Sequence, residues 1–252
     1  MKIGTVQANR DKSSFRIYRD LYYGNAPLSQ VIWTEFVMLV SNAVPGALGL
    51  LLRRSLYPSL FGACGQHLAV GRNVTLRHPC KIRLGDNVIV DDGCLIDAKG
   101  DNNNGITIGD NVFIGRNTSI YCKNGDIHIG RRVNISSNCT VFSSNKLTIE
   151  DGTIIGAYSY LLSGGEYDYT DATDFADQSG TASENDLVIG ANSWIGARVT
   201  ILDDASLGDH CVVGAGAVVT KPIPSNSLAL GVPARVVKTF SPSPGIDRPE
   251  YK

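Results

Sequence analysis

Aliphatic residues recur at every sixth position through residues 187–220. The stretch divides into LVIGAN, SWIGAR, VTILDD, ASLGDH, CVVGAG and AVVT. The third residue of each unit is aliphatic: Ile189, Ile195, Ile201, Leu207, Val213 and Val219. A period of six does not fit the 3.6-residue period of an α-helix, and it is too short for a repeated helix pair. It fits one short strand followed by one corner, so the sequence predicts an all-β solenoid.

The same spacing continues toward the N-terminus and yields twenty such positions, here called rungs, each occupied by Ile, Leu or Val. The earlier rungs are Val70, Leu76, Leu84, Val90, Ile96, Ile108, Ile114, Ile120, Ile129, Ile135, Val141, Ile149, Ile155 and Leu161. The residue two before a rung shares its inward side because side chains alternate along a strand. It is often small, as at Cys94, Thr118, Cys139, Ser193, Ala205, Cys211 and Ala217.

Irregular spacings indicate that three rungs make one triangular coil. When the faces are numbered first, second and third in chain order, all five irregular spacings fall between the second and third faces. Glycine follows the rung at 10 of 13 positions on the first and third faces, and at none of 7 on the second. At fourteen uninterrupted corners, the residue three after the rung is Asn, Asp or Gly in ten cases. These residues tolerate the left-handed backbone of a sharp corner, and His210 is interpreted as a corner residue too.

Residues 1–66 lack the six-residue period and are predicted to form a helical cap. Residues 28–52 are strongly apolar, with a helix break expected at Pro45-Gly46. Glu35, Asn42 and this break argue against a transmembrane span. One interpretation is a cap that covers the exposed edge of the first coil. The other is peripheral membrane contact through residues 28–54, with Arg53 and Arg54 facing lipid headgroups.

The predicted solenoid covers residues 67–238 and carries one long insertion, residues 163–186. That loop contains seven acidic residues and no basic one. Because it is too polar to bury itself, we expect it to arch over the edge between the second and third faces, toward a neighbouring subunit. A loop of this length in a tight repeat indicates a functional role, although a solvated loop is the simpler alternative. Residues 239–252 are expected to form a loose tail.

Composition narrows the classes of function. The net charge of −1 and pI near 6.4 do not favour nucleic-acid binding. Cys94, Cys139 and Cys211 fall at inward positions, and no CxxC pair occurs, which favours buried thiols in the cytoplasm. The N-terminus shows no signal-peptide pattern. The four histidines do not form the set of three needed for a zinc centre, so no metal is expected.

The segment VVGAGAVVTKPIPSNSLALGVPARVV resembles the C-terminal signature of the acyl-CoA-dependent hexapeptide-repeat acyltransferases. The preceding NSWIGARVTIL resembles their Trp-Ile-Gly coil. The resemblance implies a left-handed parallel β-helix, a homotrimer, and acetyl-CoA as co-substrate for O-acylation of a sugar or saccharide hydroxyl. It also implies roles for six residues. Ala197 and Ala215 would contact the pantetheine arm, Trp194 would flank it, and the phosphate or adenine end would meet Thr220, Lys221 and Arg235.

The loop that would hold the catalytic base departs from the family pattern. Family members place a histidine, the general base, in the loop that follows the rung equivalent to Leu161. Here that loop reads Ser-Gly-Gly-Glu-Tyr-Asp-Tyr, with Tyr167 at the aligned position. A tyrosine of ordinary pKa is a poor base at neutral pH, and the neighbouring carboxylates of Glu166 and Asp168 would need a raised pKa. His128 is the fourth candidate, about 10 Å from the loop base along the axis, although an exposed strand residue is its default interpretation.

Two other functions remain open at this stage. A divergent, catalytically impaired protein could bind CoA or a nucleotide-sugar without transferring an acyl group, as the missing loop histidine indicates. A structural or assembly solenoid is the second alternative, and the intact C-terminal signature argues against it.

Overall fold

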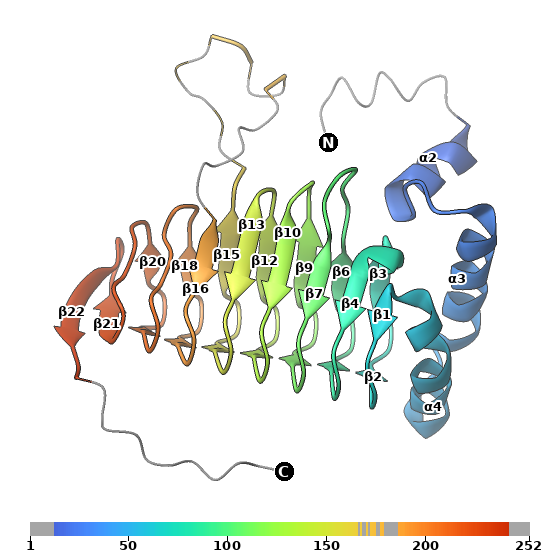
Figure 1. Ribbon diagram of the computed structural model, residues 1–252, viewed down its shortest axis with the longest axis horizontal. Coiled ribbons are helices and arrows are strands. Elements are labelled where there is room, and N and C mark those ends of the chain that lie inside the picture. The colour runs from blue at the N-terminus through green and yellow to red at the C-terminus, as the bar shows by residue number, and fades with distance from the viewer. Residues whose placement is uncertain are drawn as a thin grey trace.

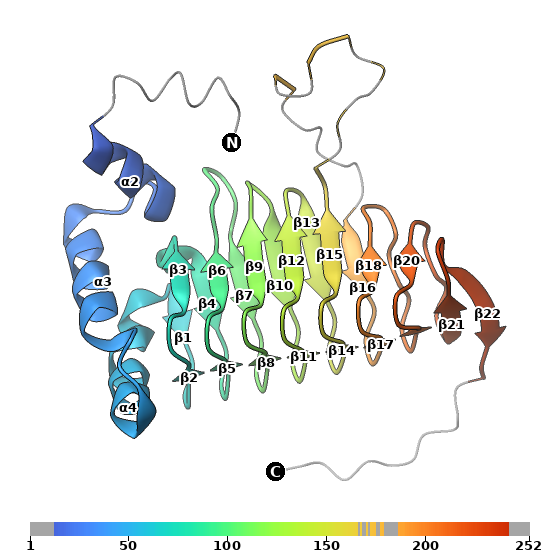
Figure 2. The ribbon, with the colours of Figure 1, turned by 180° about the vertical axis from the view of Figure 1, so that it is seen from behind.

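The computed structural model shows a left-handed parallel β-helix with three helices at one end (Figures 1 and 2). It describes residues 13–165, 167, 170, 172–174, 177, 178 and 186–241. The chain leaves the rod for the long loop after Ser163 and re-enters it at Leu187 (Figure 1). Glu166 and Asp168 lie outside the described residues, as does most of the predicted tail.

Three parallel sheets form the three faces predicted from the spacing. The first face contains β2 (Ala69–Val70), β5 (Ile89–Val90), β8 (Phe113–Ile114), β11 (Asn134–Ile135), β14 (Ile154–Ile155), β17 (Trp194–Ile195), β19 (Val212–Val213), β21 (Ser227–Leu230) and β22 (Arg235–Thr239). The second contains β3 (Thr75–Arg77), β6 (Leu95–Asp97), β9 (Ser119–Cys122), β12 (Thr140–Ser143), β15 (Tyr160–Ser163), β18 (Thr200–Ile201) and β20 (Val218–Val219). The third contains β1 (Ala63–Cys64), β4 (Ile82–Leu84), β7 (Ile106–Ile108), β10 (Asp126–Ile129), β13 (Lys146–Ile149) and β16 (Leu187–Ile189).

The rungs form the core as predicted. All twenty are at most 5% exposed, and rungs of successive coils pair in register, as Ile135 does with Ile114 and Ile155. The small inward residues beside them are also buried, Cys94, Cys139 and Cys211 among them. Burying an aliphatic side chain of this size contributes about 1.5–3 kcal/mol, so the repeated rung is the main source of the solenoid's stability.

The corners adopt the left-handed backbone that the sequence predicts. All fourteen residues at the third position after the rung have positive φ, including His210 at +55°. Four of the fourteen are neither Asn, Asp nor Gly: Arg132, Tyr158, Arg198 and His210. Left-handed backbone costs an ordinary residue roughly 1–2 kcal/mol, so these four corners are stabilised by the ladder around them.

The N-terminal segment folds into α2 (Ser14–Tyr22), α3 (Leu28–Ser41) and α4 (Gly46–Leu56), followed by the short 3₁₀ helix η1 (Tyr57–Leu60). The predicted helix break is confirmed, because α4 begins directly after Pro45. The sequence did not predict α2. Within the described residues, no helix has both the length and the apolar character needed to cross a membrane.

A buried arginine joins the helices to the first coil. Arg53, on α4, is only 2% exposed, so it does not face lipid headgroups as one interpretation of the sequence supposed. Its Nε donates to the carbonyl of Val70 at 2.7 Å, and its Nη1 donates to the carbonyls of Ser41 at 2.8 Å and Val44 at 2.9 Å. One guanidinium therefore links α3, the turn before α4 and strand β2.

The C-terminal end of the solenoid is closed by a strand that reverses direction. Strand β22 pairs antiparallel with β21, the last strand that stacks in parallel on the first face. The turn between them, residues 231–234, packs on β20 through hydrogen bonds from Val218 N to Gly231 O at 3.1 Å and from Ala234 N to Val218 O at 2.7 Å. This reversal of direction ends the ladder.

Candidate active site

Small residues line one edge of the rod, between the first and second faces. Three successive corners there contain Gly-Ala: 156–157, 196–197 and 214–215. The corners stack directly, with Arg198 N donating to Ala157 O and Gly216 N to Ala197 O, each at 2.8 Å. Ala197 and Ala215 are exposed. The edge therefore presents backbone and methyl groups to any molecule lying along it.

Glycine is required at these corners because the coils approach closely. A Cβ at Gly156 would lie 2.6 Å from the backbone N of Ala197, and one at Gly196 would lie 2.6 Å from the backbone N of Ala215. Ala157 was missed as a site residue in the sequence, although its Gly-Ala pair after a rung repeats the pattern of Ala197 and Ala215. We call the line formed by Ala157, Ala197 and Ala215 the small-residue edge.

Larger side chains flank this edge. Trp194 projects from β17 and is 60% exposed, between Ile154 and Val212 in the ladder of the first face. Tyr158 directly follows Ala157, and Arg198 directly follows Ala197 in the next coil. The guanidinium carbon of Arg198 lies 5.6 Å from the ring centroid of Tyr158. This cation–π contact offsets part of the cost of the left-handed backbone at both residues. The small-residue edge is therefore bordered by two aromatic rings and one cation.

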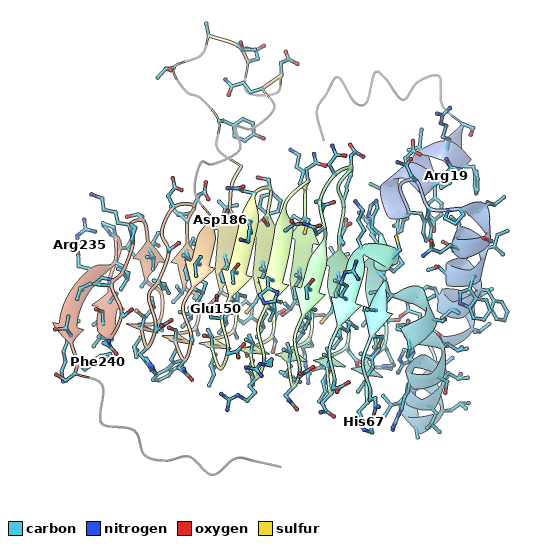
Figure 3. All side chains as sticks on the ribbon, in the orientation of Figure 1. Arg19, His67, Glu150, Asp186, Arg235 and Phe240 are labelled. Atoms are coloured by element: carbon cyan, nitrogen blue, oxygen red, sulfur yellow. The ribbon has the colours of Figure 1, made fainter. Side chains whose placement is uncertain are left out.

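The predicted polar and basic residues gather around β20 at the C-terminal end of the rod. Thr220 and Lys221 directly follow β20, and both are exposed. Arg235 begins β22 next to Ala234, which is hydrogen-bonded to β20, and Figure 3 shows Arg235 at this end of the rod. Arg235 is exposed as well, and its Nη1 donates to the carbonyl of Ala234 at 3.0 Å. The structure therefore brings two cations to one end of the second face.

The long loop begins at the opposite edge of the second face, after β15. At its base Gly164 N donates to Asp203 Oδ1 at 2.7 Å, while Oδ2 of that carboxylate is buried and has no hydrogen-bond partner in the described structure. At its far end Asp186 forms an ion pair with Lys146 at 3.2 Å. Tyr167 is 48% exposed. Asp203 is a polar residue of the loop base that sequence reasoning missed.

His128 lies on the third face, away from the loop base. It is exposed on β10 and pairs in register with Thr148, which in turn pairs with Val188 on β16. Two strand spacings, about 10 Å, therefore separate His128 from the strand at which the loop ends. The geometry matches the distance expected from the sequence and does not bring His128 to Tyr167.

A cavity of about 1140 Å³ lies on the loop's edge of the rod, at its N-terminal end. Its walls are α2 with the turn after it, and the corners that follow β3, β6 and β9. The first of these corners includes the short 3₁₀ helix η2 (Pro79–Lys81). Both ribbon views show α2 beside the tall corners of these coils (Figures 1 and 2). Phe142 lines the cavity at the end nearer the long loop.

A histidine–aspartate pair forms part of the cavity wall. His78 and Asp97 are 4% and 6% exposed, and His78 Nδ1 lies 3.0 Å from Asp97 Oδ1. The other carboxylate oxygen lies 3.7 Å from Nη1 of Arg77, whose guanidinium carbon stands 4.4 Å from the ring centroid of Tyr22. Sequence reasoning assigned no role to this pair, because the two residues are separated by a whole coil in the chain.

In the part of the chain that the structure describes, no group of three or more His, Cys, Asp or Glu side chains is arranged to hold a metal ion.

Two stretches of the chain match known protein families. Residues 186–221 match the family described as Bacterial transferase hexapeptide (six repeats), and residues 105–143 match Hexapeptide repeat of succinyl-transferase. The galactoside O-acetyltransferase of Escherichia coli (strain K12) is 34% identical over 136 residues, which cover 54% of this chain and 64% of that protein. The chain therefore spans somewhat less than two thirds of this relative.

Two solved structures share the fold. The polySia specific acetyltransferase NeuO superposes with a TM-score of 0.53 at 24% identity, covering 73% of this chain and 86% of the other. A single-residue mutant of AntD, an N-acyltransferase from Bacillus cereus in complex with dTDP and coenzyme A, gives 0.52 at 20% identity, covering 74% and 88%. At these identities the likeness is one of fold.

Proposed function

We propose that this chain, two stretches of which match hexapeptide-repeat transferase families, transfers an acyl group, acetyl in the simplest case, from acyl-CoA to a saccharide hydroxyl. The small-residue edge that ends near two cations is the observation that carries this proposal. Lys221 and Arg235 pair with the phosphates of CoA, because cationic donors form strong hydrogen bonds with phosphate oxygens. The pantetheine arm then runs along Ala215 and Ala197 toward Ala157, with Trp194 beside it.

The proposed reaction needs no metal and no redox cofactor. The acceptor oxygen attacks the thioester carbonyl, a C–O bond forms, the C–S bond breaks, and the hydroxyl proton passes through a base to the departing thiolate. In this proposal the long loop supplies or covers that base, because it leaves the second face at the coil of Ala157. Tyr167, Glu166 and Asp168 are its candidates, with His128 farther along the third face.

The first prediction concerns CoA binding. Lys221→Glu and Arg235→Glu should each weaken acetyl-CoA binding by at least about 1.5 kcal/mol, because each removes a charged hydrogen bond to phosphate and adds repulsion. Calorimetry on the purified variants measures this change. Lys238→Glu is the control, since Lys238 is an exposed lysine on the same strand as Arg235. Unchanged affinity in both test variants would remove these residues from the site.

The second prediction concerns turnover and the base. A thiol-release assay with common sugar acceptors should show activity in the wild type. Removal of a true general base should lower the rate by about 10²–10⁴, so Glu166→Gln, Asp168→Asn and His128→Ala identify it. Tyr167→His should change little in an enzyme that already has its base. An inactive wild type together with an active Tyr167→His would instead establish the catalytically impaired alternative, and no turnover in any variant would favour a binding or structural role.

We also propose that the protein is a homotrimer. The outward side of the first face carries an unusually apolar row, in which Ile89, Ile154 and Trp194 are 45%, 49% and 60% exposed. Apolar outward strands mark contact surfaces. Within one chain, the small-residue edge and the loop lie at opposite edges of the second face, so a neighbouring protomer would bring them together.

The third prediction tests this assembly. Light scattering at micromolar concentration should give a mass near three times 27.0 kDa. A mass equal to that of one chain would contradict the trimer.

Helix α3 supports peripheral membrane contact, which we propose as well. Its outward side carries an apolar stripe of Leu28, Ile32, Phe36 and Leu39, which are between 50% and 83% exposed, with the exposed Glu35 at its border. Exposed apolar side chains in such a row are unusual on a surface helix, whose outward side is normally polar. Arg54 on the next helix is exposed as well, and so is Arg16 on α2. An exposed apolar stripe together with exposed cations of the same helical cap fits a bilayer surface that contains anionic lipid.

The fourth prediction follows from that stripe. Wild-type protein should sediment with phosphatidylcholine vesicles containing phosphatidylserine, and Leu39→Asp should reduce the bound fraction several-fold, because a carboxylate in the stripe opposes insertion. Val237→Asp, at an aliphatic residue 56% exposed on β22, is the matched control. Equal sedimentation of Leu39→Asp and wild type, or no sedimentation of either, would rule out this contact.

A further inference from the structure

The cavity at the N-terminal coils is strongly cationic in a protein whose net charge is −1. Six basic residues line it, against three acidic ones, a net of +3 from six minus three. The basic residues are Arg16, Arg19, Arg77, Lys81, Lys99 and Lys123, and the acidic ones are Asp20, Asp97 and Asp101. A concave surface lined mainly by one sign of charge concentrates ligands of the opposite sign.

Two of these cations, Arg19 and Arg77, keep hydrogen-bond capacity, although Arg77 also pairs with Asp97 at 3.7 Å and donates from Nη2 to Tyr22 Oη at 3.4 Å. Lys81 is committed to Gly100 O at 2.6 Å and Asn103 Oδ1 at 2.9 Å. By contrast, the Nε atoms of Arg19 and Arg77 are buried and have no hydrogen-bond partner in the described structure. A buried donor without a partner costs free energy, about 1–3 kcal/mol, and a shift of the side chain that brings this donor to a bound acceptor oxygen would recover it.

Asp97 pairs with Arg77, and its charge is already counted in the net of +3. It is shared between His78 and Arg77, and the backbone N of His78 donates to Tyr22 O at 2.7 Å, which fixes the end of α2 over this corner. His78 lies at the level of β3, four strand spacings or about 19 Å from β15, where the long loop begins. At that distance His78 is a positioning residue and does not reach an acyl group near the loop.

The other end of the cavity is aromatic. Tyr121 and Phe142 have ring centroids 4.9 Å apart, and Phe142 lies beside the loop base, where a Cβ at Gly165 would stand 3.6 Å from its ring. Aromatic faces with a few convergent polar groups are typical of small-molecule sites. From β3 to β12 the cavity spans three strand spacings, about 14 Å, which is longer than one sugar ring.

We propose that this cavity is the acceptor site and that the acceptor is an anionic saccharide. Its carboxylate or phosphate binds Arg19 and Arg77, and a second sugar ring lies on Tyr121 and Phe142, with a hydroxyl directed toward the long loop. This inference rests on the proposed acyl transfer, and it adds the chemical class of the acceptor and the end of the rod that recognises it.

Calorimetry with three probes tests the proposal. Trigalacturonate supplies carboxylates, UDP-glucose supplies a diphosphate, and maltotriose is the neutral counterpart. At least one anionic probe should bind the wild type ten-fold or more tightly than maltotriose, and its binding should weaken with added salt. The tighter of the two anionic probes identifies carboxylate or phosphate as the recognised group.

Substitutions of lining residues test whether the anionic probe binds in this cavity. Arg19→Met and Arg77→Gln should each lower the affinity for the anionic probe at least ten-fold. Arg83→Met, at an exposed arginine of β4 outside the cavity, should leave that affinity unchanged. Lys221→Glu should also leave it unchanged, which separates this cavity from the proposed CoA end. The proposal is wrong if no probe binds, if maltotriose binds as tightly as both anions, or if Arg19→Met behaves like Arg83→Met. Acetyl-CoA binding by the same samples reports separately on the proposed function.

Discussion

Each coil of this protein must return its chain to within one strand spacing of the coil before it, because every strand takes its hydrogen bonds from the neighbouring coils. The corners meet this constraint with left-handed residues at a fixed position. Once the corners are in register, whatever residue type repeats at a corner is aligned along the rod. The small-residue edge is a direct result, since Ala157, Ala197 and Ala215 occupy equivalent positions in three coils.

The same constraint explains where the molecule departs from regularity. Extra residues enter only at the edge between the second and third faces, so the coils stay in register while this one edge changes shape. The corners after β3, β6 and β9 form a cavity wall there, and the loop after β15 begins at the same edge. Regular coils thus supply the scaffold, and one irregular edge carries the features that distinguish this chain.

The regular part was predictable from sequence because it depends on local repeats. The phase of rungs such as Ile135 and Val141 is visible in the chain, and so are the asparagines and glycines of the corners. The cavity was not predictable, since it depends on contacts between Tyr22, His78 and Asp97, whose positions are set by helix packing and by the shape of insertions. Helix α2 lacked the apolar run that identified α3. One of the two interpretations of the N-terminal segment placed Arg53 at lipid headgroups, because nothing in its sequence neighbours shows that three backbone carbonyls accept its hydrogen bonds.

The two ends of the rod are closed by unrelated devices, a buried arginine at one and a strand reversal at the other. Each contacts only the coil beside it, so the number of coils between them is independent of both. Six strand spacings, about 29 Å, separate β3 from β20, and Figure 3 shows Arg19 and Arg235 at opposite ends. The distance between the two ends of the solenoid therefore changes in steps of one coil. Gain or loss of one coil would reset the separation between its two basic regions by about 4.8 Å without redesigning either.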